Sequence, residues 1–217
     1  MKKKQKEIFL NHEGNSWFER NHSALQKRKF GLKDPIIRAI SKCLNGKLSK
    51  KKKLLEIGCG EAKRLKWISK NLKLKCYGVE PSEKAVALAN SKDAKVIQGT
   101  ADLLDFENKN FDFVVFGFCL YLCDRSDLFQ IAKEADRVLK DNGYLIILDF
   151  YSTKNTKNKY HHQAGIFSYK MDYRKLFDWH PNYNCFFHEV EDHGGDGFID
   201  DENNWVATSI IKKKMGK

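Results

Sequence analysis

Two glycines and one distant carboxylate form the group of residues in this 217-residue sequence that could most readily bind a ligand. Gly58 and Gly60 follow the apolar run 54–57, and Glu80 closes the next apolar run. Glycines let a backbone turn tightly and approach a ligand closely. A carboxylate at the end of a second strand can accept hydrogen bonds from both hydroxyls of a ribose. The spacing therefore predicts a nucleoside-type ligand.

This glycine motif is shorter than a dinucleotide fingerprint. Lys63 occupies the third glycine position of G-x-G-x-x-G, so close packing of a helix beneath a pyrophosphate is not specified. The departure disfavours a Rossmann oxidoreductase that binds NAD, which stays one alternative.

Short apolar runs that alternate with amphipathic stretches must position these residues. Runs of this kind suit strands buried on both faces of a parallel sheet, and they occur at 54–57, 76–79, 95–97, 113–118 and 144–150. Helical spacing is clearest at 125–140, with Asp124 as the N-cap and Asn142-Gly143 as the stop. The alternation predicts an α/β fold with a Rossmann-like, doubly wound sheet.

The last third of the chain adds two further strand patterns, 183–190 and 205–211, joined by the acidic, glycine-rich loop 192–203. Two neighbouring strands joined directly by a loop pair antiparallel. We therefore expect seven strands, mostly parallel, with a C-terminal antiparallel hairpin. We expect a single domain over 1–217, made of a basic helical segment (1–50), a cofactor-binding core (51–150), an insertion at the acceptor site (151–180) and the hairpin (181–217).

Over roughly 50–150, the sequence resembles the class I S-adenosylmethionine-dependent methyltransferases. Residues 56–60 (Glu-Ile-Gly-Cys-Gly) are similar to their first motif, and Glu80 to their ribose-binding acid. Residues 100–102 resemble the segment whose Asp meets the adenine amino group, and 116–120 the loop beside the methionine and substrate. The resemblance implies S-adenosylmethionine as cofactor, held by Glu56, Gly58, Cys59, Gly60, Glu80, Pro81, Ala101, Asp102 and Phe116. This cofactor carries no phosphates, which agrees with the short glycine motif.

Two outer segments supply candidates for covering the site. In this family the residues before the first motif often form a lid, so Trp17 and Arg20 are expected to cover the cofactor or the acceptor; alternatively, Trp17 staples a helix to the core. Tyr121 stands where many relatives carry His, which leaves a general base at that position in doubt, and we expect Tyr121 to contact the substrate.

The insertion should lie above the carboxyl ends of the strands, where ligands bind in open α/β sheets. His161 and His162 are candidate catalytic bases for a hydroxyl acceptor, although either could simply pack. Substrate contacts are expected from Tyr160, Tyr169, Asp172 and Tyr173. No metal is expected, because the two histidines are adjacent and loop 192–202 lacks the order of a calcium hand.

The formal net charge of +12 arises in the first quarter of the chain. Residues 1–55 hold 16 Lys and Arg against 4 Asp and Glu, and the remainder is balanced. Such a segment could attract nucleic acid or an anionic surface, or form a solvated face. Only 7 of 40 basic residues are Arg, the better reader of phosphates and bases.

We therefore expect an S-adenosylmethionine-dependent methyltransferase acting on a small polar metabolite, by O-methylation of a sugar or a related surface-polysaccharide precursor. The W-F-x-R-N segment with the Y-H-H insertion resembles bacterial methyltransferases of surface-carbohydrate biosynthesis. An RNA methyltransferase and a non-catalytic cofactor-binding protein are the alternatives. The absence of an apolar run of ~20 residues and of an export signal, with six cysteines in no CxxC pair, predicts a cytoplasmic protein without a membrane span. The oligomeric state is left open.

Overall fold

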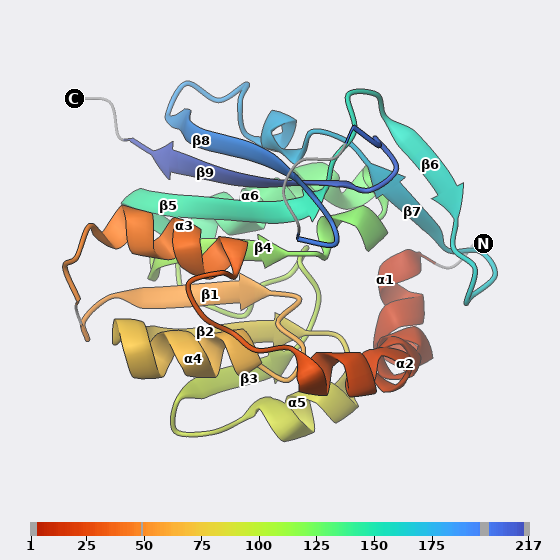
Figure 1. The fold of residues 1–217 in the computed structure, drawn as a ribbon, viewed down its shortest axis with the longest axis horizontal. Coiled ribbons are helices and arrows are strands. Elements are labelled where there is room, and N and C mark those ends of the chain that lie inside the picture. Colours follow the sequence, from red (N-terminus) through yellow and green to blue (C-terminus); the bar gives the residue numbers. More distant parts are fainter. Residues whose placement is uncertain (1–3, 49, 196–199, 215–217) are drawn as a thin grey trace.

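A seven-stranded sheet with the order β3-β2-β1-β4-β5-β9-β8 organises the computed structural model, which describes residues 4–48, 50–195 and 200–214 (Figure 1). Strands β1 to β5 pair parallel, and β9 pairs antiparallel with both β5 and β8. The predicted fold is therefore confirmed. The strands are β1 Lys53–Ile57, β2 Lys75–Glu80, β3 Ala94–Gln98, β4 Phe111–Gly117, β5 Leu139–Phe150, β8 Tyr183–Asp192 and β9 Trp205–Lys213.

Helices cover both faces of this sheet because its inner strands are apolar on both sides. Leu54 packs with α3 and α4 on one face, while its neighbour Leu55 packs with α6 on the other. Figure 1 shows α3 and α4 in front of the sheet and α6 behind it. The helices are α1 Gln5–Ile8, the π-helix η1 Phe9–Glu13, α2 Gly14–Lys27, α3 Pro35–Leu44, α4 Lys63–Leu72, α5 Glu83–Ala89 and α6 Leu128–Val138.

Helix α3 belongs to the core, although the sequence placed it in a lid over 1–50. Asp34 caps its first turn by accepting the backbone N–H groups of Ile36 and Ile37, both at 3.1 Å. Ile36, Ile37 and Ile40 are fully buried. The segment outside the sheet layers is therefore 5–27, which we call the N-terminal segment.

Three local features were not predicted from the sequence. Helix α6 ends at Val138 rather than near 140, and Asn142, with φ +62°, lies inside β5 instead of stopping a helix. Strand β9 lies between β5 and β8, so the hairpin's second strand is the inner one. The insertion contains a two-stranded arm that was not predicted, formed by β6 Thr156–Lys159 and β7 Phe167–Lys170.

Candidate active site

The glycine loop follows β1 directly and has left-handed backbone at both glycines. Gly58 has φ +76° and Gly60 has φ +54°. A Cβ on Gly58 would lie 2.7 Å from Cβ of Cys119, whereas a Cβ on Gly60 would meet no atom within 4 Å. Gly58 thus allows the loops after β1 and β4 to touch, and the space that a ligand can use lies at Gly60. Ala62 also has a positive φ, of +59°, where the chain turns into α4.

Glu80 links the glycine loop to the turn after β2. Its Oε2 accepts the Gly60 N–H at 2.9 Å, and its Oε1 accepts the Ser82 N–H at 3.0 Å. Burial raises the pKa of Glu80 to about 6, although these two backbone hydrogen bonds act in the opposite direction. Each carboxylate oxygen has a second lone pair, so the side chain can still accept ribose hydroxyls.

Glu56 forms a buried ion pair in the structure. Its carboxylate pairs with Arg64, whose Nε lies 3.2 Å from Asp34 Oδ1. Burial raises the pKa of Glu56, and Arg64 opposes that shift. The expected contact of Glu56 with the ammonium end of the cofactor stays a prediction. Cys59 is directed at Gly78 of β2, so its thiol packs within the fold.

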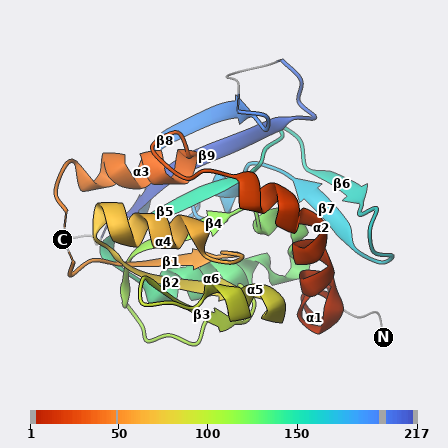
Figure 2. The same cartoon turned by 60° about the horizontal axis from the view of Figure 1, so that its bottom comes forward.

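The N-terminal segment lies across the ends of β1 and β2. A Cβ on Gly14 would be 3.1 Å from the Ser82 nitrogen, so this glycine permits backbone contact between α2 and the Pro81–Ser82 turn. Asn15 Oδ1 accepts the Ser82 hydroxyl at 2.8 Å. Near the other end of α2, the Leu25 carbonyl accepts a hydrogen bond from Lys63 at 3.1 Å. Figures 1 and 2 place α1 and α2 beside the edge toward which β1 and β4 point.

Asp102 anchors this N-terminal segment. Lys6 forms an ion pair with its carboxylate, and the Thr100 hydroxyl donates to Oδ1 at 2.7 Å. Although burial opposes it, these hydrogen bonds hold the pKa of Asp102 below its usual value. Adenine recognition by Asp102 stays a prediction, and it would require Lys6 to share the carboxylate. Ala101 and Phe116 lie in the core, 7% and 0% exposed.

Four of the predicted covering and substrate residues come together above the strand ends. Burial raises the pKa of Tyr121, and the nearby Trp17 side chain opposes that shift. Arg20 donates to the hydroxyl of Tyr160 at 3.0 Å and pairs with Glu13, which also accepts the Tyr160 hydroxyl at 3.1 Å. Sequence reasoning missed Glu13, a carboxylate only 1% exposed. It ends a π-helix, a feature that is frequent at functional sites.

The other predicted substrate residues lie elsewhere. Tyr173 is 4% exposed and packs in the core, and Tyr169 stacks under the guanidinium of Arg125 at 4.1 Å. Asp172 caps the turn Tyr173–Leu176 and forms an ion pair with Arg174 at 2.6 Å. These contacts within the protein explain the positions of all three side chains, with no need for a bound substrate.

His161 and His162 lie at the tip of the β6–β7 arm. Both are exposed, and the His162 ring meets that of Tyr160 edge-on, with centroids 5.4 Å apart. Their proposed role as bases stays a prediction.

An aromatic cluster, not foreseen from the sequence, occupies the edge where β4 and β5 end. We define it as Phe118, Tyr121, Phe150 and His193. The Phe118 and Phe150 rings lie 5.5 Å apart, and Tyr121 meets Phe150 at 4.9 Å. His193 packs on Phe118 at 5.5 Å and on Phe150 at 5.1 Å.

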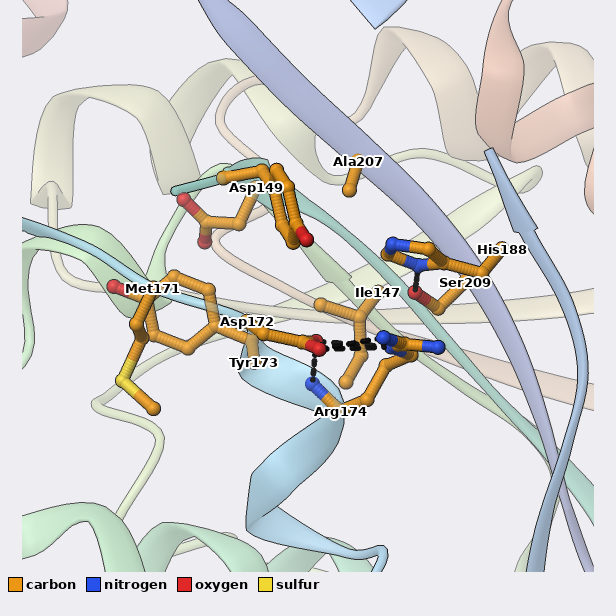
Figure 3. Close-up of a pocket in the computed structure, with 10 residues that line it drawn as sticks. Ile147, Asp149, Met171, Asp172, Tyr173, Arg174, His188, Ala207 and Ser209 are labelled. Carbon is orange, nitrogen blue, oxygen red and sulfur yellow. Dashed lines mark hydrogen bonds and ion pairs between the residues drawn. The ribbon is translucent and has the colours of Figure 1, made fainter. Parts of the chain in front are cut away.

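A separate small cavity is lined by residues of β5, β8 and β9 and of the segment 171–174 (Figure 3). Its volume is about 10 Å³, enough for roughly one water molecule. His188 Nδ1 hydrogen-bonds the Ser209 hydroxyl at 2.9 Å, while its Nε2 is buried without a hydrogen-bond partner among the described residues. Asp149 also lines this cavity. The space is too small for a metabolite.

Within the described residues, no group of three or more His, Cys, Asp or Glu side chains is placed to hold a metal ion. Part of the acidic loop at 192–202, namely 196–199, lies outside the described residues. None of the described helices is long and apolar enough to cross a membrane.

Comparison with known proteins agrees with this geometry. Residues 55–147 match the family model of a methyltransferase domain. Over 111 residues, 48% of this chain and 42% of the relative, the sequence is 28% identical to an uncharacterized methyltransferase, YcgJ, of Bacillus subtilis. Over 82 residues, 35% of this chain and 34% of the relative, it is 34% identical to a demethylmenaquinone methyltransferase of Bacillus mycoides. The alignments span between 34% and 58% of the curated relatives' lengths.

A solved SAM-dependent methyltransferase of Methanosarcina mazei superposes with a TM-score of 0.61 at 18% identity, over 80% of this chain and 98% of that one. Residues 55–147 therefore carry a methyltransferase domain, and the sheet order is that of the class I, Rossmann-like fold of solved SAM-dependent methyltransferases. The cofactor of this class is S-adenosylmethionine, as expected from the sequence.

Proposed function

We propose that this protein transfers a methyl group from S-adenosylmethionine to a small polar metabolite. The observation that carries the proposal is the placement of Glu80, whose carboxylate joins the Gly60 loop to the Ser82 turn directly beside α2. A nucleoside bound there would place its ribose at a carboxylate and its remainder against a glycine with free space.

The residues present fit this cofactor. Glu80 would accept the ribose hydroxyls, the loop at Gly58–Gly60 would lie along the amino-acid portion, and α2 would exclude water from above. S-adenosylmethionine supplies a methyl group that is already activated by its positive sulfonium. The protein then has to align the acceptor and hold a group that can take its proton.

The polar group above the strand ends favours a hydroxylated acceptor. Glu13, Arg20 and Tyr160 are linked by hydrogen bonds, and together they offer a charge pair and a hydroxyl of the kind that a sugar can bind. This supports O-methylation of a sugar or a related surface-polysaccharide precursor as the finer proposal.

RNA is the second choice of acceptor. Several basic side chains of the first quarter are engaged in contacts within the protein and are therefore less available to RNA. Lys4 pairs with Asp127, Lys6 pairs with Asp102, and Lys53 donates a hydrogen bond to Asn110. The non-catalytic alternative would bind the cofactor and transfer nothing. A cytoplasmic location stays a prediction.

The test compares two glycines that share a left-handed backbone conformation. Gly60 and Gly46 both have positive φ and free space at the Cβ position, but Gly46 lies in the turn after α3. Gly60→Ala and Gly46→Ala should therefore lose similar stability, about 1 kcal/mol each. Only Gly60→Ala should weaken S-adenosylhomocysteine binding measured by calorimetry. Equal affinities in both variants would remove the cofactor from this loop.

The acceptor class is tested with methyl-labelled S-adenosylmethionine and a cell extract that is divided into a small-molecule fraction and an RNA fraction with a nuclease-treated control. We expect label in the small-molecule fraction and none in Gly60→Ala. Nuclease-sensitive label would establish the RNA alternative, and cofactor binding without label in either fraction would establish the non-catalytic one.

A further inference from the structure

We propose that His193 is the catalytic base of this site, taking the proton from the acceptor hydroxyl in place of His161 or His162. The proposal rests on the methyl-transfer function proposed above. It assigns a residue that lies more than 130 positions from the glycine loop in the sequence.

Topology brings His193 to the catalytic edge of the sheet. Strand β8 runs antiparallel to β9, and β9 runs antiparallel to β5. The C-terminal end of β8 therefore lies at the same edge as the C-terminal ends of β4 and β5. His193 directly follows β8, and its backbone N–H donates to the Asn204 carbonyl at 2.8 Å. The backbone that carries the imidazole is thus fixed to the start of β9.

A chain of contacts connects this imidazole to the glycine loop. The His193 ring packs on Phe118 and Phe150 with centroid distances of 5.5 and 5.1 Å. The residue after Phe118 is Cys119, whose Cβ lies 2.7 Å from the Cβ position of Gly58. His193 and the cofactor loop therefore contact neighbouring residues of the same two-residue segment, 118–119.

The backbone of that segment is held in an uncommon conformation. Phe118 has φ +58°, which for a bulky residue is a genuine outlier. Conformations of this type cost about 1–3 kcal/mol and cluster at functional sites. In this case the conformation is held by a hydrogen bond from the Phe118 N–H to the Leu148 carbonyl at 2.8 Å. Its consequence is that an aromatic ring meets the His193 imidazole at the strand edge.

The surroundings of His193 keep the imidazole neutral at pH 7, as a base requires. Partial burial lowers the pKa of His193; Asp192 opposes the shift, while Arg28 and Lys170 add to it. The rings packed against it, Phe118 and Phe150, carry no charge. The residue is nevertheless exposed, so an acceptor can reach it.

The other histidines have less suitable positions. His161 and His162 are at the exposed tip of the arm, and His188 is turned inward to Ser209. His12 contacts Gln163 of the arm, and His22 contacts Gln26 on α2. His180 packs against Trp179 and Tyr183, at the opposite end of β8 from His193.

The step balances without a further reactant. The acceptor oxygen forms a bond to the methyl carbon, and the carbon–sulfur bond breaks with its electron pair remaining on sulfur. The hydroxyl proton passes to a ring nitrogen of neutral His193, which releases it to solvent after the product leaves.

The experiment compares His193→Gln and His193→Asn with His180→Gln, a matched imidazole replacement at the opposite end of β8. Labelled S-adenosylmethionine and the small-molecule fraction of a cell extract serve as substrates. We expect S-adenosylhomocysteine affinity within about twofold of wild type in all variants, and a loss of ~10²–10⁴ in transfer rate only at position 193. NMR titration of wild type should give His193 a pKa below 6.5 that coincides with the acidic limb of the transfer rate, and this limb should vanish in His193→Gln.

Full transfer by both His193 variants, or an acidic limb that does not match the NMR titration, would overturn the proposal while leaving methyl transfer in place. Loss of S-adenosylhomocysteine affinity in these variants would assign His193 to cofactor binding and would also overturn it. Wild type that binds the cofactor and labels no small molecule would contradict the proposed function itself, and the base assignment with it.

Discussion

At the scale of single residues, Glu80 is the group on which the cofactor site depends. Its two oxygens accept backbone N–H groups from two different loops, so this carboxylate fixes the loops, and we propose that it also accepts the ribose hydroxyls. An amide at this position must direct its NH₂ group at one of these two donors. Replacement by Gln therefore affects both the loop geometry and the ligand.

Glu80→Gln should weaken S-adenosylhomocysteine binding by about one to two decades, because charge-assisted hydrogen bonds contribute about 1.5–3 kcal/mol each. The pH dependence is the sharper readout. Burial raises the pKa of Glu80 to about 6, and we expect the ionised form to bind the ribose, so wild-type affinity should fall as pH drops below 6. Calorimetry from pH 5 to 8 should show this limb in wild type and not in Glu80→Gln.

Glu83→Gln, in the first turn of α5, is the control for a nearby lost charge, and it should keep both the affinity and the limb. A wild-type affinity that is flat down to pH 5 would contradict the role of Glu80, as would unchanged affinity in Glu80→Gln.

At the scale of elements, Gln5 fixes the N-terminal segment onto the rest of the site. The side chain is 2% exposed. Its Nε2 donates to the Leu122 carbonyl at 2.7 Å and to the Phe167 carbonyl at 3.1 Å, and its Oε1 accepts the Phe167 N–H at 2.7 Å. One residue of α1 thus joins the loop after β4 to the arm strand β7.

Gln5→Ala should loosen this segment without unfolding the sheet. Buried backbone groups left unpaired cost about 1–3 kcal/mol, so we expect faster hydrogen exchange across 5–27 and a rise of about tenfold in the dissociation constant for S-adenosylhomocysteine. Leu10→Ala, in the same segment and more exposed, should change neither. If exchange across 5–27 increases while affinity is unchanged, the segment does not cover the cofactor.

The parts of this account that the sequence predicted are the ones set by local spacing. Strands β1 and β2, the glycine loop and Glu80 lie within 53–80, where each apolar run and its turn are adjacent in the chain. Gln5 and Glu13 could not be found in this way, because their partners Phe167 and Tyr160 are about 150 residues away. A polar residue of this kind becomes recognisable only when its burial is known.

His193 was missed for a related reason. Its placement depends on β9 lying between β5 and β8, whereas the sequence predicted only a hairpin. Conversely, Tyr173 and Asp172 were chosen for their residue types, and their burial and capping contacts come from the turn Tyr173–Leu176, which has no strong sequence signal.

At the scale of the whole molecule, Asp149 links stability to pH. This buried carboxylate at the end of β5 accepts the N–H groups of Leu120 and Phe150, both at 2.8 Å. Burial nevertheless raises its pKa from 3.8 to about 7. The folded state therefore favours the protonated form, and the stability contributed by this group is complete below pH 3.8 and lost as pH rises through 7.

The comparison of wild type with Asp149→Asn isolates this effect from the other carboxylates. The free energy of unfolding of wild type, minus that of Asp149→Asn, should fall by about 4 kcal/mol between pH 4 and pH 8. Denaturant titrations of both proteins across that range measure it. A difference that does not depend on pH would show that Asp149 is ionised throughout and that its hydrogen bonds outweigh its burial.

The central claim, that the glycine loop, Glu80 and α2 enclose the cofactor, is tested most directly by hydrogen exchange of the wild-type protein with and without saturating S-adenosylmethionine. We expect slowed exchange in 57–62, 80–83 and 13–20, and no change around the small cavity at His188 and Ser209. Binding demonstrated by calorimetry with unchanged exchange in 57–62 and 80–83 would contradict it.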